Sequence, residues 1–176
     1  SAEYVSSRAA EVSPTTISKL EGVRPGLESK DTTHFSILDF DGNAVSNTYT
    51  LNASFGSGVV VGGAGFLLND EMDDFSSKPG VPNQYGVVGG DANAIEPGKR
   101  MLSSMSPTIL IKNGKPVVVV GTPGGSTIFT SVFQVMVNLM DFDMAPEKAV
   151  SSTRFHHQLL PPDEVTFDPG IPLPTR

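Results

Sequence analysis

The sequence has no cysteine among its 176 residues. This absence excludes disulfide bonds, thiolate-bound metals and a cysteine nucleophile. It leaves the compartment open, because oxidising compartments also hold cysteine-free proteins. The sequence also lacks any apolar run near the roughly 20 residues that cross a bilayer as a helix. We therefore expect no membrane span in this chain.

Positive charge is scarce and scattered along the chain. The 12 Lys and Arg residues are outnumbered by 19 Asp and Glu residues, which gives a formal net charge of −7. Proteins that bind nucleic acid usually carry a basic patch for the phosphates, and no Lys/Arg cluster is present here. The composition argues against a nucleic-acid partner, and the length predicts one domain or part of one.

Glycine and proline are abundant, with 18 and 14 residues, and the glycines occur in clusters. Clustered glycine is typical of backbone that comes close to something else. One long stretch, Ser76 to Pro97, is rich in Gly, Pro and Asn and has no periodicity. Loops of that length in a compact domain are often functional, and we predict a lid over about Ser76 to Gly90.

Alternating residues and turn signals predict two hairpins. The first starts at Thr32, turns at Asp41-Gly42-Asn43 and returns over Ala44 to Leu51. The second pairs Met105 to Ile111 with Pro116 to Gly121, around an Asn-Gly turn.

Helices are predicted on both sides of these hairpins. A short helix around Glu3 to Val12 and a polar connector precede Thr32, and longer apolar patterns predict helices over Thr127 to Met140 and Ala145 to about Thr153. Ser126 is placed to cap the first of these two. The order of elements predicts an α+β fold in which helices cover antiparallel sheet.

Thr32 opens the first strand directly after the polar connector. Threonine is common in strands, so an ordinary strand residue is one interpretation. The other is an N-terminal threonine nucleophile, whose own α-amino group activates the hydroxyl oxygen. Sequence spacing does not separate the two.

Polar pairs at strand ends and turns are further candidates. Thr50 and Asn52 lie two residues apart, so both side chains leave one face of the sheet. Glu71 and Asp74 lie three apart in a short helical turn and converge on one side. Solvent-facing polar residues are the ordinary alternative for both pairs. A buried carboxylate pair would suit an ammonium group.

The later segments carry weaker signals. Ser103 and Ser104 precede a strand, and Gly124-Gly125 could donate backbone N–H groups to an oxyanion, although a Gly-Gly turn before a helix is common. The three histidines, at positions 34, 156 and 157, lack the spacing of a metal motif, so no metal or cofactor is expected.

Taken in order, six motifs resemble the small subunit of the γ-glutamyltranspeptidases over residues 32 to about 160. The motifs are Thr32-Thr33-His34-Phe35-Ser36, Thr48-Tyr49-Thr50-Leu51-Asn52, Leu68 to Phe75, Pro79 to Asn83, Leu102 to Thr108, and Gly124-Gly125-Ser126. The resemblance implies the N-terminal nucleophile hydrolase fold, a four-layer αββα sandwich, here in part. It also implies a precursor that cuts itself between Asp31 and Thr32.

The resemblance assigns catalytic roles to four residues. Thr32 is the nucleophile and, through its freed amine, the base. Thr50 orients it, and the backbone N–H groups of Gly124 and Gly125 form the oxyanion hole.

The resemblance also assigns substrate contacts. Asn52, Glu71 and Asp74 hold the α-amino end of a γ-glutamyl group. Its α-carboxylate is bound by Ser103 and Ser104. Tyr85 in the lid gates the bound group.

The implied activity is γ-glutamyl transfer or hydrolysis on glutathione and other γ-glutamyl compounds, with an amino acid or peptide as acceptor. Residues 1–31 would then be a pre-cleavage connector, and residues 32–176 a catalytic domain truncated at its C-terminus. We expect the large subunit of the same precursor as a partner, a periplasmic or extracellular location, and little activity from this chain alone.

Three alternatives stay open on the sequence. A glutaryl-cephalosporin acylase would use the same nucleophile, but its substrate has no ammonium for Glu71 and Asp74. A poly-γ-glutamate depolymerase or anchoring transferase would use the same head-group contacts. A non-catalytic homologue would serve as a binding domain and would not cleave itself.

Overall fold

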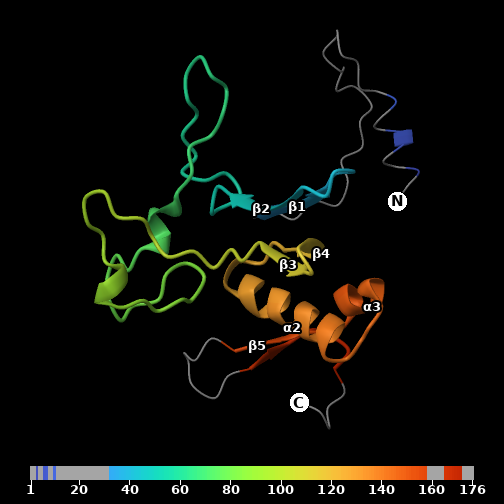
Figure 1. Cartoon of the computed structure of the whole chain (residues 1–176). Coiled ribbons are helices and arrows are strands. Elements are labelled where there is room, and N and C mark those ends of the chain that lie inside the picture. Colours follow the sequence, from blue (N-terminus) through green and yellow to red (C-terminus); the bar gives the residue numbers. More distant parts are fainter. Residues whose placement is uncertain (1–2, 4–5, 8–9, 11–31, 158–164, 172–176) are drawn as a thin grey trace.

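The computed structural model describes residues 3, 6, 7, 10, 32–157 and 165–171. The predicted connector before Thr32, Asp31 itself, and most of the predicted helix around Glu3 to Val12 lie outside these residues. The described part holds two hairpins, two α-helices and long loops between them (Figure 1).

The first hairpin pairs β1 (Thr32–Leu38) with β2 (Ala44–Thr50) in antiparallel fashion. Its turn forms because the Asp39 carboxylate accepts N–H bonds from Asp41 and Asn43, at 2.9 and 2.8 Å. The register places Thr32 opposite Thr50, so the predicted hairpin is confirmed.

The second hairpin pairs β3 (Thr108–Lys112) with β4 (Lys115–Val120) around the predicted Asn113-Gly114 turn. Both turn residues have positive φ, 52° and 75°, as the favoured two-residue hairpin turns require. The strand predicted from Met105 begins only at Thr108. The Ser106 and Thr108 hydroxyls donate to carbonyls two residues upstream, and such local bonds compete with strand pairing.

The helical part begins with η3 (Gly125–Thr127), a 3-10 turn that runs into α2 (Ile128–Met140), and continues to α3 (Pro146–Ser151). The helix predicted over Thr127 to Met140 is confirmed, with α2 beginning one residue later. The helix predicted over Ala145 to about Thr153 is also present but shorter, because α3 begins at Pro146 and ends at Ser151. The predicted Ser126 cap is wrong, because Ser126 lies inside η3 and neither helix start has a side-chain cap hydrogen bond.

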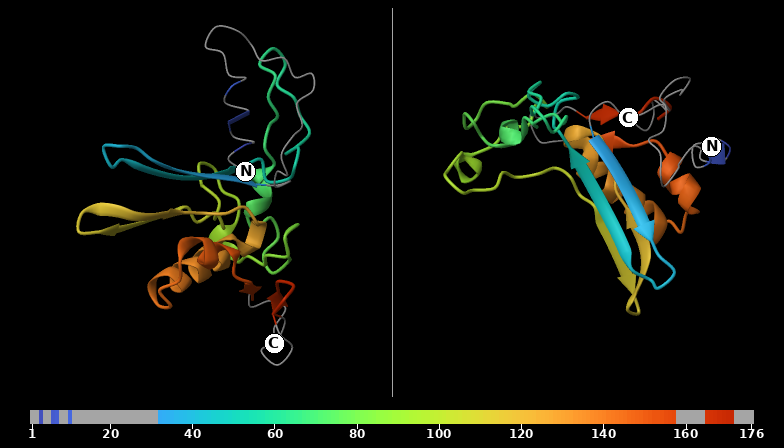
Figure 2. Two further views of the ribbon diagram at one scale, coloured as in Figure 1. Left: turned by 90° about the vertical axis from the view of Figure 1, so that its right-hand side faces the viewer. Right: turned by 90° about the horizontal axis from the view of Figure 1, so that it is seen from above.

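The two hairpins and the helices stack as three layers (Figure 2). The β1–β2 ribbon lies over the β3–β4 ribbon, and α2 with α3 lies beyond it. Ile128, Val132 and Val135 form the buried stripe of α2, at the spacing of one helix face, and Ala149 of α3 is fully buried. A small ladder, β5 (Phe155–His156) with β6 (Thr166–Phe167), completes the described elements and is too short for a sequence pattern to indicate.

The long connection between β2 and β3 carries only short 3-10 turns. These are η1 (Glu71–Asp74) and η2 (Asp91–Asn93), with isolated bridges between Val60 and Leu67 and between Pro82 and Val88. The prediction of a loop over Ser76 to Pro97 is confirmed. Among the described residues, no helix is long and apolar enough to cross a membrane.

Candidate active site

Thr32 is the first residue of β1, and its side chain is buried, with 6% of its surface exposed. Directly across the ladder lies Thr50, whose hydroxyl accepts the Asn52 N–H at 2.9 Å. Asn52 is buried and has a left-handed backbone, with φ of 74°, which turns the chain sharply away after β2. The end of the first hairpin thus brings these three polar side chains together.

The acidic turn η1 places Glu71 and Asp74 side by side, because residues three apart eclipse in a 3-10 helix. Burial, then the hydrogen bond to Asp74 and the Asp74 charge, raises the pKa of Glu71 to about 7. Burial also raises the pKa of Asp74. Two carboxyl groups this close share a proton near neutral pH, so the pair is a site that a cation would stabilise.

A second turn, Gly124-Gly125, precedes α2. The φ angles are 142° and 57°, values that side-chain-bearing residues rarely adopt, and a Cβ on Gly124 would come within 2.7 Å of the Thr127 hydroxyl. Ser104 donates its hydroxyl proton to the Gly125 carbonyl at 3.0 Å. This bond fixes the orientation of the peptide group at Gly125.

Tyr85 of the Ser76–Gly90 loop reaches across the site. Its hydroxyl donates to the Asn52 carbonyl at 2.8 Å, and its ring lies so close to Gly125 that an added Cβ there would be 3.1 Å from Cδ1. Asn83, two residues before it, accepts the Tyr85 and Val87 N–H groups and so holds the loop's bend. The loop therefore lies closed between the end of β2 and the glycine turn.

Most of the predicted site residues line one small pocket of about 20 Å³, the space of about one water molecule. They are Thr32, Thr50, Asn52, Asp74, Tyr85, Ser103, Ser104 and Gly125, joined by Met105 and Ile128.

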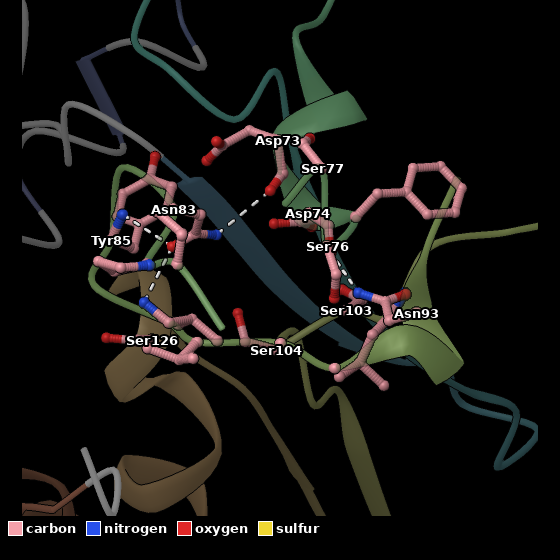
Figure 3. A pocket seen from close by; sticks show the side chains of 18 of the residues that line it. Asp73, Asp74, Ser76, Ser77, Asn83, Tyr85, Asn93, Ser103, Ser104 and Ser126 are labelled. Atoms are coloured by element: carbon pink, nitrogen blue, oxygen red, sulfur yellow. Dashed lines mark hydrogen bonds between the residues drawn. The ribbon is translucent and has the colours of Figure 1, made fainter. Parts of the chain in front are cut away.

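A larger cavity of about 810 Å³ adjoins the small pocket and shares Asp74, Tyr85, Ser103 and Ser104 with it. Figure 3 shows Asp74 on one side of this cavity, with Ser104 and Ser126 on the opposite side. Eight of the predicted site residues thus line the small pocket, and a molecule bound there would have room to extend into the larger cavity.

Three predicted residues stand apart from the small pocket. Glu71 reaches it only through its contact with Asp74, and Gly124 lies beside Gly125 without lining it. Asp31 lies outside the described residues.

The sequence interpretation missed Asp70, whose carboxylate accepts the Ala53 N–H at 2.9 Å and whose carbonyl accepts the Asn52 amide. No spacing rule singles out this residue in an acidic turn.

The model of the family described as gamma-glutamyltranspeptidase matches residues 1–176. The chain belongs to the γ-glutamyltranspeptidase family. A glutathione hydrolase proenzyme from Pseudomonas aeruginosa is 70% identical over 170 residues, which are 97% of this chain and 30% of that protein. The chain therefore spans about a third of that relative's length.

Solved structures of the γ-glutamyltranspeptidase family share the fold. The enzyme from Pseudomonas nitroreducens in complex with L-DON is 71% identical, with a TM-score of 0.76 over 80% of this chain and 73% of that one. An acivicin-inhibited γ-glutamyltranspeptidase, for which roles of the C-terminus in autoprocessing and catalysis are described, is 60% identical, with a TM-score of 0.77 over 81% of this chain and 76% of that one. The fold is therefore that of the N-terminal nucleophile hydrolases, of which the described residues form three layers.

Proposed function

We propose that this chain is the catalytic region of a γ-glutamyltransferase and glutathione hydrolase. The observation that carries the proposal is the small pocket in which Thr32 meets Asp74, Ser103 and Gly125, which come from four separate segments. An amide substrate needs a nucleophile, a proton acceptor and oxyanion stabilisation, and this set provides them once Thr32 has a free amine.

The reaction begins with the precursor cutting itself between Asp31 and Thr32. The freed α-amine then takes the Thr32 hydroxyl proton while Oγ attacks the γ-carbonyl carbon of the substrate. The N–H groups of Gly124 and Gly125 bind the oxyanion, and the proton passes to the departing amine. Water or an acceptor amine next attacks the γ-glutamyl ester and restores the Thr32 hydroxyl.

Recognition of the γ-glutamyl group divides between the two sides of the site. Asn52, Glu71 and Asp74 bind the α-ammonium, because a cation relieves the repulsion of two adjacent carboxylates. On the other side, Ser103 accepts the Met105 N–H at 3.2 Å and keeps its own hydroxyl proton for the α-carboxylate. The Ser104 proton is engaged by Gly125, so Ser104 also steadies the oxyanion turn.

The carboxyl pair favours this function over the alternatives. A glutaryl group has no ammonium, so in an acylase the pair would face an apolar carbon chain and destabilise the complex. Tyr85, bonded to Asn52 across the pocket, favours small donors over a polymer such as poly-γ-glutamate.

The test uses the full-length precursor of this chain. Wild type should split into two polypeptides, the smaller beginning at Thr32, and should gain the mass of one γ-glutamyl group when trapped with a γ-glutamyl amide. Thr32→Ala should stay uncut and unlabelled. Thr33→Ala, at an exposed neighbour in the same strand, is the matched control and should behave as wild type. A small polypeptide that begins elsewhere, or a label on another residue, would contradict the proposal.

A further inference from the structure

The face of the β1–β2 hairpin that packs on β3–β4 is polar. It carries the alternate residues Thr32, His34 and Ser36 of β1 and their partners Thr50, Thr48 and Ser46 of β2. The opposite face carries Phe35, Ile37 and Tyr49, which are 40%, 53% and 55% exposed. Interfaces between stacked sheets are usually apolar, so polar side chains here need specific partners.

His34 is the centre of this polar interface. Its Nδ1 lies 2.7 Å from the buried Thr48 hydroxyl, and its Nε2 lies 3.0 Å from the Ser36 hydroxyl. Burial lowers the pKa of His34, so the ring is neutral and one nitrogen donates while the other accepts. The ring is thus held at both ends and cannot rotate without losing two hydrogen bonds.

The held ring lies directly on Gly121, the residue after β4. A Cβ on Gly121 would come within 2.2 Å of His34 Cε1 and 2.3 Å of Nδ1, so only glycine leaves room for the ring. The Ser46 hydroxyl donates to the Val120 carbonyl at 3.0 Å, which joins the two hairpins at the same point. This His34–Gly121 contact sets the separation of β1 from the end of β4.

Both partners of the contact lead directly into the reacting groups. Thr32 lies two residues from His34, about 7 Å along an extended strand. The chain runs from Gly121 through Thr122 and Pro123 to the glycine turn at Gly124-Gly125. We propose that His34 is a positioning residue that fixes the distance between the Thr32 hydroxyl and the oxyanion-binding N–H groups. The inference rests on the proposed function and adds His34 to the residues on which that function depends.

The physical reason is the small tolerance of acyl transfer. Reacting atoms must approach to about 3–3.5 Å, and a displacement of about 1 Å can cost on the order of a hundredfold in rate. Oxyanion donors work only at about 2.7–3.1 Å from the developing charge. Of the contacts proposed for the substrate's ammonium and carboxylate, only Asn52, just after β2, belongs to the hairpin, and the others lie on η1 and at Ser103. A shift at His34 should therefore lower kcat and leave the donor KM nearly unchanged.

The experiment measures kcat and KM for a γ-glutamyl amide with variants of the full-length, processed enzyme. Gly121→Ala, which adds the clashing Cβ, should lower kcat by roughly a hundredfold. The double variant His34→Ala with Gly121→Ala removes the clash and should recover at least about tenfold over Gly121→Ala alone, because contacting residues are not additive. Gly62→Ala, at a glycine with open space around it, is the matched control and should behave as wild type.

A milder pair of variants keeps the test valid if Gly121→Ala does not fold. Thr48→Val removes the Nδ1 partner at similar size and should lower kcat with an unchanged KM, while Thr48→Ser, which keeps the hydroxyl, should retain the wild-type kcat. The role of His34 would be overturned if the loss of kcat in the double variant were the sum of the losses in Gly121→Ala and His34→Ala, or if kcat and KM changed equally. Either result would leave the proposed function intact. A wild-type enzyme that is inactive on γ-glutamyl amides would overturn both.

Discussion

Replacing Tyr85 by phenylalanine tests whether the closed loop controls the fate of the acyl-enzyme. The substitution keeps the ring against Gly125 and removes only the hydroxyl that donates to the Asn52 carbonyl at 2.8 Å. A neutral hydrogen bond contributes about 0.5–1.5 kcal/mol net, because water replaces it when the loop opens. That energy is a factor of roughly 2 to 10 in the ratio of closed to open loop.

In the proposed reaction an open loop would admit water to the γ-glutamyl ester, so the ratio of hydrolysis to transfer should rise by that same factor of about 2 to 10. Tyr85→Ala also loses the ring contact and should change the ratio more. The assay measures both products at one fixed acceptor concentration, together with the rate of acyl-enzyme formation, which should stay near the wild-type value. Gln84→Ala, whose exposed side chain lines neither cavity, is the control. A partition ratio equal to wild type in both Tyr85 variants would refute the reasoning.

Two further predictions concern the carboxyl pair. Asp74→Asn should weaken the binding of a γ-glutamyl donor by up to about 3 kcal/mol, roughly a hundredfold, and the binding of a glutaryl donor far less, because only the γ-glutamyl donor carries an ammonium. Equal losses for the two donors in parallel KM measurements would count against the assignment. Since the pKa of Glu71 is about 7, the pair gains its second negative charge as pH rises through neutrality, so donor KM should fall across that range. Glu71→Gln should flatten this dependence, and a KM profile unchanged from wild type would contradict it.

Local patterns in the sequence were sufficient for the elements that local forces determine. The turn predicted at Asp41-Gly42-Asn43, the Asn113-Gly114 turn and the apolar stripe of α2 each depend on residues a few positions apart, and each is present. Errors occurred at element ends, where side chains compete with the backbone for hydrogen bonds. Ser126 lies inside the 3-10 turn η3 instead of capping α2. The Ser106 and Thr108 hydroxyls bond carbonyls two residues upstream, where β3 was predicted to begin.

The site divides in the same way. The sequence by itself determined which residues are available, because six motifs in order identify Thr32, the carboxyl pair, the serines and the glycine turn through their family resemblance. Only the tertiary structure decided how they meet. Three contacts join residues 21 to 87 positions apart: the hydrogen bond from Tyr85 to Asn52, the hydrogen bond from Ser104 to Gly125, and the packing of His34 against Gly121. Such contacts depend on how the hairpins stack, and no periodicity along the chain encodes the spacing between two layers.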